Sequence, residues 1–136
     1  MVGEWKTEMT VNGVKTGSAT HKRTWDPGRY CLRMSWESEE NGVPVNALGI
    51  SGWNPETKEV VEHWYDSLGR YGSVQYPLEK MTKDAWEGTA RRVLPDGKIN
   101  EGTCRLEKGD GRWVFSISGQ EDGQAMTVKN FTLKVD

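Results

Sequence analysis

A histidine, a tyrosine, an aspartate and a serine crowd into one short segment, HWYDS at residues 63–67. A histidine titrates near neutral pH and can take up or release a proton, and a phenol beside it can assist that transfer. An aspartate that is buried without a partner has a raised pKa and can also act as an acid or a base. His63, Tyr65 and Asp66 are therefore the candidate catalytic residues.

The segment that carries these residues alternates as a β-strand does, so its side chains divide between two faces. One face carries Val61, His63, Tyr65 and Ser67, and the other carries Glu62, Trp64 and Asp66. The sequence leaves open which face points into the protein. It also leaves a structural alternative, in which Asp66 and Ser67 close the tight turn DSLG through hydrogen bonds to the backbone and His63 only packs in the sheet.

The rest of the chain indicates what holds this strand in place. Turn sequences recur at short intervals, among them two Asn-Gly pairs at 12–13 and 41–42, NPET at 54–57 and PDG at 95–97. The segments between them alternate with period two, as in RYCLRMSWES at 29–38. Short strands joined by hairpins predict an all-β fold, a single antiparallel up-and-down barrel of about 8–10 strands that occupies residues 1–136 as one domain.

Composition narrows the possible functions. The net charge of −2 with both signs interspersed gives no electrostatic footprint for nucleic acid. The two cysteines and two histidines have no metal-ligand spacing, so we expect no metal site and no cofactor. No apolar run is long enough for a membrane span. The location is left open: cytoplasmic if Met1 is the native start, and secreted or periplasmic if a leader was removed. Seven tryptophans are a large amphipathic content that suits a core or a pocket.

Two motifs carry a resemblance. Gly3-Glu4-Trp5 is similar to the G-x-W that opens the first strand of lipocalins and their calycin relatives, where a basic side chain from a late strand covers the tryptophan; Lys129 or Lys134 could serve here. A second motif resembles the core signature G-[IL]-[ST]-G-[YFW]-[DN]-P-x-T…W-x-D-S-x-G of an uncharacterised family of bacterial lipocalin-like proteins. Its matching positions are Gly49, Ile50, Ser51, Gly52, Trp53, Asn54, Pro55, Thr57, Trp64, Asp66, Ser67 and Gly69. The resemblance implies a lipocalin-like barrel and implies no activity.

A barrel of eight to ten strands has an interior that can hold one small ligand. We therefore expect the protein to bind a small, mostly apolar molecule as a carrier or sensor, and to be a monomer or a weak homodimer. The alternative is a barrel enzyme, such as an isomerase or cyclase, in which His63 or Tyr65 moves a proton. The expected ligand-binding residues are Met34, Trp36, Leu48, Ile50, His63, Tyr65, Trp86, Trp113, Phe115 and Phe131.

Overall fold

The computed structural model describes residues 2–109, 111–121 and 123–135, so Met1 and Asp136, the ends of the expected domain, lie outside the described residues. Ten strands make up most of the described residues, and within them a single 3₁₀ turn, η1 (Leu78–Lys80), follows the sixth strand. The strands are β1 (Gly3–Val11), β2 (Val14–Trp25), β3 (Cys31–Glu40), β4 (Val43–Asn54), β5 (Glu59–Asp66), β6 (Tyr71–Pro77), β7 (Ala85–Val93), β8 (Ile99–Gly109), β9 (Arg112–Glu121) and β10 (Gln124–Lys134).

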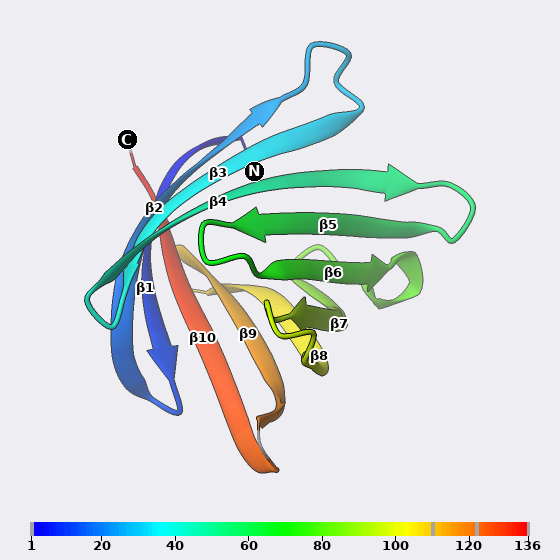
Figure 1. The fold of residues 1–136 in the computed structure, drawn as a ribbon. Coiled ribbons are helices and arrows are strands. Elements are labelled where there is room, and N and C mark those ends of the chain that lie inside the picture. Colours follow the sequence, from blue (N-terminus) through cyan, green and yellow to red (C-terminus); the bar gives the residue numbers. More distant parts are fainter. Residues whose placement is uncertain (1, 110, 122, 136) are drawn as a thin grey trace.

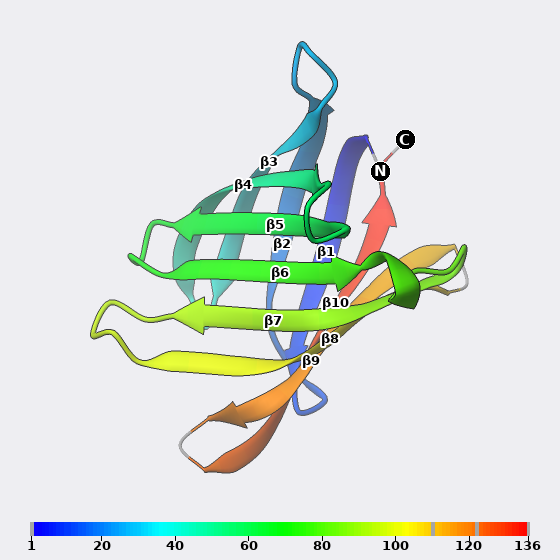
Figure 2. The same cartoon turned by 90° about the vertical axis from the view of Figure 1, so that its right-hand side faces the viewer.

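Each strand runs antiparallel to the strands before and after it in the chain, and β10 pairs with β1 to close the sheet (Figures 1 and 2). The closing register places Trp5 opposite Lys134 and Val11 opposite Val128. Closure leaves no unpaired strand edge, which a sheet of ten long strands would otherwise expose. The prediction of an all-β, antiparallel, up-and-down barrel is confirmed, with ten strands.

The hairpins follow the turn chemistry of the sequence. Asn12 and Asn41 adopt φ of 49° and 50°, and the glycines after them adopt 83° and 81°. Positive φ at both central residues is the requirement of the two-residue turns whose twist matches a hairpin. The Asn54 side chain accepts hydrogen bonds from the backbone N–H groups of Glu56 and Thr57 at 3.0 and 3.4 Å, which closes the predicted turn.

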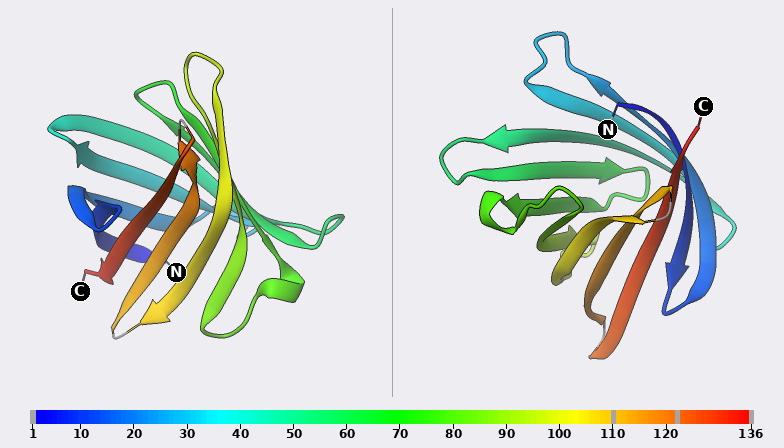
Figure 3. Two further views of the ribbon diagram at one scale, coloured as in Figure 1. Left: turned by 90° about the horizontal axis from the view of Figure 1, so that it is seen from below. Right: turned by 180° about the vertical axis from the view of Figure 1, so that it is seen from behind.

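The two ends of the barrel are formed by different parts of the chain. The start of β1 and the end of β10 pair with each other at one end of the barrel, which we call the floor (Figures 1 and 2). The β1–β2, β3–β4 and β5–β6 hairpins lie at the opposite end, which we call the mouth, and Figure 3 shows the same barrel from below and from behind. Toward the floor Trp5, Met34 and Tyr76 are buried, whereas Gln120 and Glu121 at the mouth are exposed.

Glycine within a strand often marks a bend or the close approach of another group, and β4 contains Gly49 and Gly52. At Gly49 the close neighbour is Trp64, because a Cβ there would lie 2.7 Å from the indole ring and 2.9 Å from Cε of Met34. At Gly52 a Cβ would meet nothing nearer than 3.6 Å. Gly49 therefore makes room for an indole inside the barrel, which fixes the side of β5 that points inward.

Candidate functional site

The barrel encloses a cavity of about 620 Å³ to which all ten strands contribute side chains. Successive side chains of a strand point to opposite faces, so over most of each strand every second residue lines the cavity. The aromatic part of the lining consists of Trp5, Trp36, Trp64, Tyr76, Trp113 and Phe115. The aliphatic part consists of Met9, Val11, Val45, Val74, Leu106, Ile117, Met126 and Val128. The wall is therefore mostly apolar.

Three of the expected ligand-binding residues line this cavity, namely Trp36, Trp113 and Phe115. Met34 also points inward but lies beneath the lining, 2% exposed. Trp86 packs partly buried against Tyr76, with 5.5 Å between the ring centroids. Phe131 lies on the other face of β10, where the guanidinium of Arg112 stands 4.7 Å from its ring centroid.

The other four expected ligand-binding residues lie on the outside of the barrel, and this corrects the sequence-based placement. Leu48, Ile50 and Tyr65 are 69%, 55% and 66% exposed, and His63 is exposed beside them. His63 Nδ1 and the hydroxyl of Tyr71 form a 2.6 Å hydrogen bond on that surface. His63 and Tyr65 point outward because the other face of β5 points inward. On that inward face Trp64 fills the space over Gly49, and Glu62 pairs with Arg23.

Near the floor a buried ion pair crosses the cavity. Arg23 Nη1 lies 3.5 Å from Glu62 Oε2, and the two side chains are only 14% and 12% exposed. Glu62 Oε1 also accepts a hydrogen bond from Trp64 Nε1 at 3.3 Å. Taking two charges out of water is costly, and the single long contact between them recovers only part of that cost. These residues were not among the expected ligand-binding residues, although Ala19, His21 and Arg23 share one face of the alternating segment SATHKRTW.

His21, which the sequence analysis left out of the site, lies beside this pair. It is 7% exposed and lies stacked between Trp5 and Trp36, with ring centroids 6.3 and 5.3 Å away. Burial, and secondarily the positive charge of Arg23, lowers the pKa of His21 to about 4. The imidazole is therefore neutral at physiological pH, because both causes disfavour its charged form.

Two further groups that could ionise are held neutral in the same region. Burial and the nearby Glu62 carboxylate raise the pKa of the Tyr76 phenol far above its usual value. Burial and Glu62 also raise the pKa of the Cys104 thiol to about 12. Neither group supplies an anion near neutral pH, and a protonated thiol is a poor nucleophile. Glu62 and Arg23 are thus charged side chains of the cavity wall near these neutral groups.

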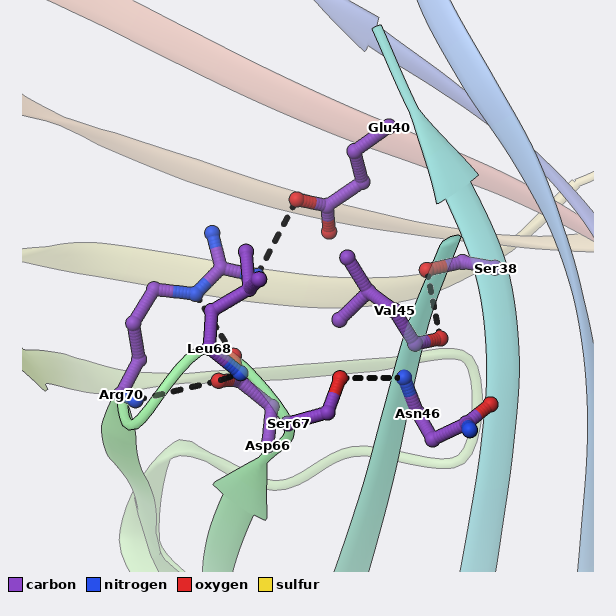
Figure 4. A network of polar contacts seen from close by, with 8 residues as sticks. All are labelled: Ser38, Glu40, Val45, Asn46, Asp66, Ser67, Leu68 and Arg70. Atoms are coloured by element: carbon purple, nitrogen blue, oxygen red, sulfur yellow. Dashed lines mark hydrogen bonds and ion pairs between the residues drawn. The ribbon is translucent and has the colours of Figure 1, made fainter. Parts of the chain in front are cut away.

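At the mouth, Asp66 is held by the turn that follows it (Figure 4). Its Oδ1 accepts hydrogen bonds from the backbone N–H groups of Leu68 at 2.9 Å and Arg70 at 3.0 Å. Its Oδ2 accepts from Arg70 Nε at 2.6 Å, and Arg70 Nη2 reaches Glu40 at 3.1 Å. Ser67 Oγ accepts from the backbone N–H of Asn46 at 3.0 Å. Closure of the DSLG turn, the structural alternative, is therefore observed for Asp66, whereas Ser67 bonds to the backbone of β4 outside the turn.

Trp5 has the basic neighbour that its motif implies. Lys134 Nζ lies 5.9 Å from the centroid of the Trp5 ring, at the floor, whereas Lys129 lies on the outward face of β10. In the part of the chain that the structure describes, no three His, Cys, Asp or Glu side chains come together as metal ligands. Within the same described residues, no helix has the length and apolar character needed to cross a membrane.

Comparison with known proteins shows the fold and nothing finer. No protein-family model matches the chain, and no curated protein does. Thirteen chains of solved structures match it, and one of them is the crystal structure of Rv2717c from M. tuberculosis. That match covers 99% of this chain and 92% of the other, with a TM-score of 0.68 and 12% sequence identity. The chain therefore shares a ten-stranded antiparallel barrel with a protein to which its sequence bears little likeness.

Proposed function

We propose that the barrel binds a small, mostly apolar molecule in its interior, as a carrier or a sensor. The observation that supports this is the cavity of about 620 Å³ with a wall of aromatic and aliphatic side chains. Small-molecule sites typically have volumes of about 300–1,000 Å³ and combine apolar walls with a few polar groups that fix orientation. The polar groups of the lining include His21, Arg23 and Glu62 toward the floor, and Glu40, Asp66 and Arg70 at the mouth.

The affinity would come from apolar surface that the guest and the wall remove from water, at roughly 25 cal/mol per Å² before the cost of association. Such a site has no need of a second subunit, because all ten strands of one chain complete the wall. We accordingly propose a monomer or a weak homodimer, and a place for the chain among the lipocalin-like barrels whose motifs it resembles. The Trp5–Lys134 contact at the floor supports that placement.

The enzyme alternative has no observation that favours it. His63 and Tyr65, the groups it relied on for proton transfer, point away from the cavity. Asp66, the third candidate, lines the mouth, but both of its oxygens accept hydrogen bonds within the turn. The histidine that a guest in the interior would contact is His21, which is neutral, and not His63. Binding without chemistry is the function that the arrangement supports best.

Blocking the cavity tests the proposal. Gly72 lines the interior, and a Cβ there would meet only Arg91 O at 3.8 Å and Trp64 Cβ at 3.9 Å, so Gly72→Leu places a side chain in the lumen without a clash at its root. Gly52→Leu is the matched control, because Gly52 lies on the outward face of β4 and a Cβ there also makes only ordinary contacts.

The measurement is quenching or enhancement of tryptophan fluorescence by a panel of apolar compounds, since several tryptophans line the wall. We expect saturable binding by the wild-type protein and by Gly52→Leu, and binding at least about 10-fold weaker in Gly72→Leu. Equal binding by all three proteins, with circular dichroism showing all three folded, would place the compounds outside the barrel and refute the proposal.

A further inference from the structure

One wall of the cavity holds polar atoms that have no partner. Among the residues that the structure describes, four buried side-chain atoms make no hydrogen bond: Trp5 Nε1, His21 Nδ1, Arg23 Nε and Asn130 Oδ1. All four residues line the cavity, and they lie on β10, β1 and β2, which are adjacent strands. A buried polar group left without a partner costs about 1–3 kcal/mol. This wall therefore lacks partners that a guest could supply.

The missing partners are mainly acceptors. Trp5 Nε1 and Arg23 Nε can only donate, and the neutral His21 ring carries one N–H of its own. The carboxylate beside them, Glu62, already accepts from Trp64 and Arg23. Asn130 Oδ1 is an unpaired acceptor, and His21 Nδ1 donates or accepts according to the tautomer of the ring. A guest group with two acceptor oxygens would serve the two atoms that can only donate, Trp5 Nε1 and Arg23 Nε.

Four arginines line the cavity, and their surroundings show at which end such a group would bind. Near the mouth, Arg91 pairs with Glu101 at 3.3 Å and Arg92 is exposed. At the mouth, Arg70 is satisfied by two carboxylates, Asp66 at 2.6 Å and Glu40 at 3.1 Å. Near the floor, Arg23 has a single carboxylate contact at 3.5 Å and an unpaired Nε, although its side chain is just as buried. The buried guanidinium with an unpaired nitrogen is therefore the inner one. A planar guanidinium binds a carboxylate through two parallel N–H···O bonds.

We infer that the guest is an amphiphile with a carboxylate, whose carboxylate lies near the floor against Arg23 and whose apolar body extends toward the mouth. This inference rests on the proposed function, because it concerns the same cavity. The carboxylate competes with Glu62 for the guanidinium and also meets the N–H groups of Trp5 and His21. The aromatic and aliphatic wall between floor and mouth covers the apolar body.

Three probes with the same tail and different heads separate this inference from the proposed function. Decanoate, decanol and decylammonium are titrated into the wild-type protein with tryptophan fluorescence as the readout. We expect decanoate to bind at least about 10-fold more tightly than decanol, which is the usual gain from a charge-assisted hydrogen bond. We expect decylammonium to bind most weakly, because Arg23 repels it. If no probe binds, the proposed function fails. If decanoate binds no more tightly than decanol, the proposed function stands and this inference is overturned.

Variants then locate the head group. Arg23→Met alone would leave Glu62 buried without its cation, so it is combined with Glu62→Gln to keep the floor uncharged. This double variant should bind decanoate and decanol equally. Arg33→Met is the control, because Arg33 lies on the outside of the adjacent strand in a 2.9 Å ion pair with Asp26. It should retain the full preference for decanoate.

Glu62→Gln alone gives an independent test that keeps Arg23 in place. Because the variant removes the competing carboxylate, it should bind decanoate several-fold more tightly than the wild type and leave decanol binding unchanged. A preference for decanoate that survives in the double variant, or that disappears in Arg33→Met, overturns the inference. If the double variant does not fold, Glu62→Gln decides: weaker or unchanged decanoate binding then overturns it.

Discussion

The buried imidazole of His21 gives the protein a pH dependence of stability whose size follows from the structure. Between Trp5 and Trp36 its pKa falls from 6.5 to about 4, because burial and the charge of Arg23 disfavour the protonated ring. Between these two pH values the unfolded chain binds a proton that the native protein does not. Stability therefore falls as the pH falls from 6.5 to 4. Each pKa unit is worth about 1.36 kcal/mol, so the whole loss is about 3 kcal/mol.

The assay is urea denaturation of the wild type, His21→Phe and His63→Gln between about pH 7 and pH 4.5. Phenylalanine keeps an aromatic ring in the stack and removes the titrating group. His63 is the control, because its side chain is exposed on the outer face of β5. Over this range the wild type and His63→Gln should lose about 2 kcal/mol more free energy of unfolding than His21→Phe. The comparison between variants removes the contribution of the carboxylates. Parallel curves for His21→Phe and the wild type would show that His21 is not buried between the two indoles, and would refute the reasoning.

Two further predictions concern packing and reactivity. Gly49→Ala should lower the free energy of unfolding by about 1–3 kcal/mol, because the added Cβ would lie 2.7 Å from the Trp64 ring. Gly52→Ala, whose added Cβ makes only ordinary contacts, should change the free energy of unfolding little. Equal effects of the two variants in urea denaturation would contradict the packing of Trp64 over β4. In the native protein an alkylating reagent should label Cys31 long before Cys104, whose thiol is buried and has a pKa raised to about 12. Peptide mass mapping of the labelled protein checks this, and rapid native labelling of Cys104 would show that the interior opens there.

The fold could be predicted from the sequence because its signals are local. The Asn-Gly pairs require positive φ and specify hairpins, and the structure has that geometry at Asn12 and Asn41. Period-two alternation between such turns leaves few arrangements other than a closed meander. The closure of the DSLG turn by Asp66 was also open to prediction, because a side chain that binds the backbone two residues later is a local event.

The composition of the cavity could not be predicted in the same way, because both faces of several strands carry large side chains. On β4 the inward residues include Ala47 and Gly49, while Leu48 and Ile50 face solvent. The usual expectation that the larger apolar residue lies inside fails there, because the space over β4 is already filled by Trp64 from the next strand. Contacts between neighbouring strands decide which face of a strand points inward, and alternation within one strand carries no information about that.

His21 and Arg23 escaped prediction for a related reason. They lie in the polar segment SATHKRTW, which is typical of a solvated strand. The structure buries them because Trp5 and Trp36 stack on the imidazole, and because Glu62, three strands away across the barrel, reaches the guanidinium. The only signal in the sequence was that Ala19, His21 and Arg23 share one face.

Anomalous diffraction from crystals grown with a bromine-labelled apolar guest, such as 10-bromodecan-1-ol, tests most directly whether the interior is a binding site. The account predicts a bromine peak inside the barrel, in contact with aromatic wall residues such as Trp36, Trp113 or Phe115. A peak confined to the outer face of β4 and β5, among Leu48, Ile50 and Tyr65, would contradict it.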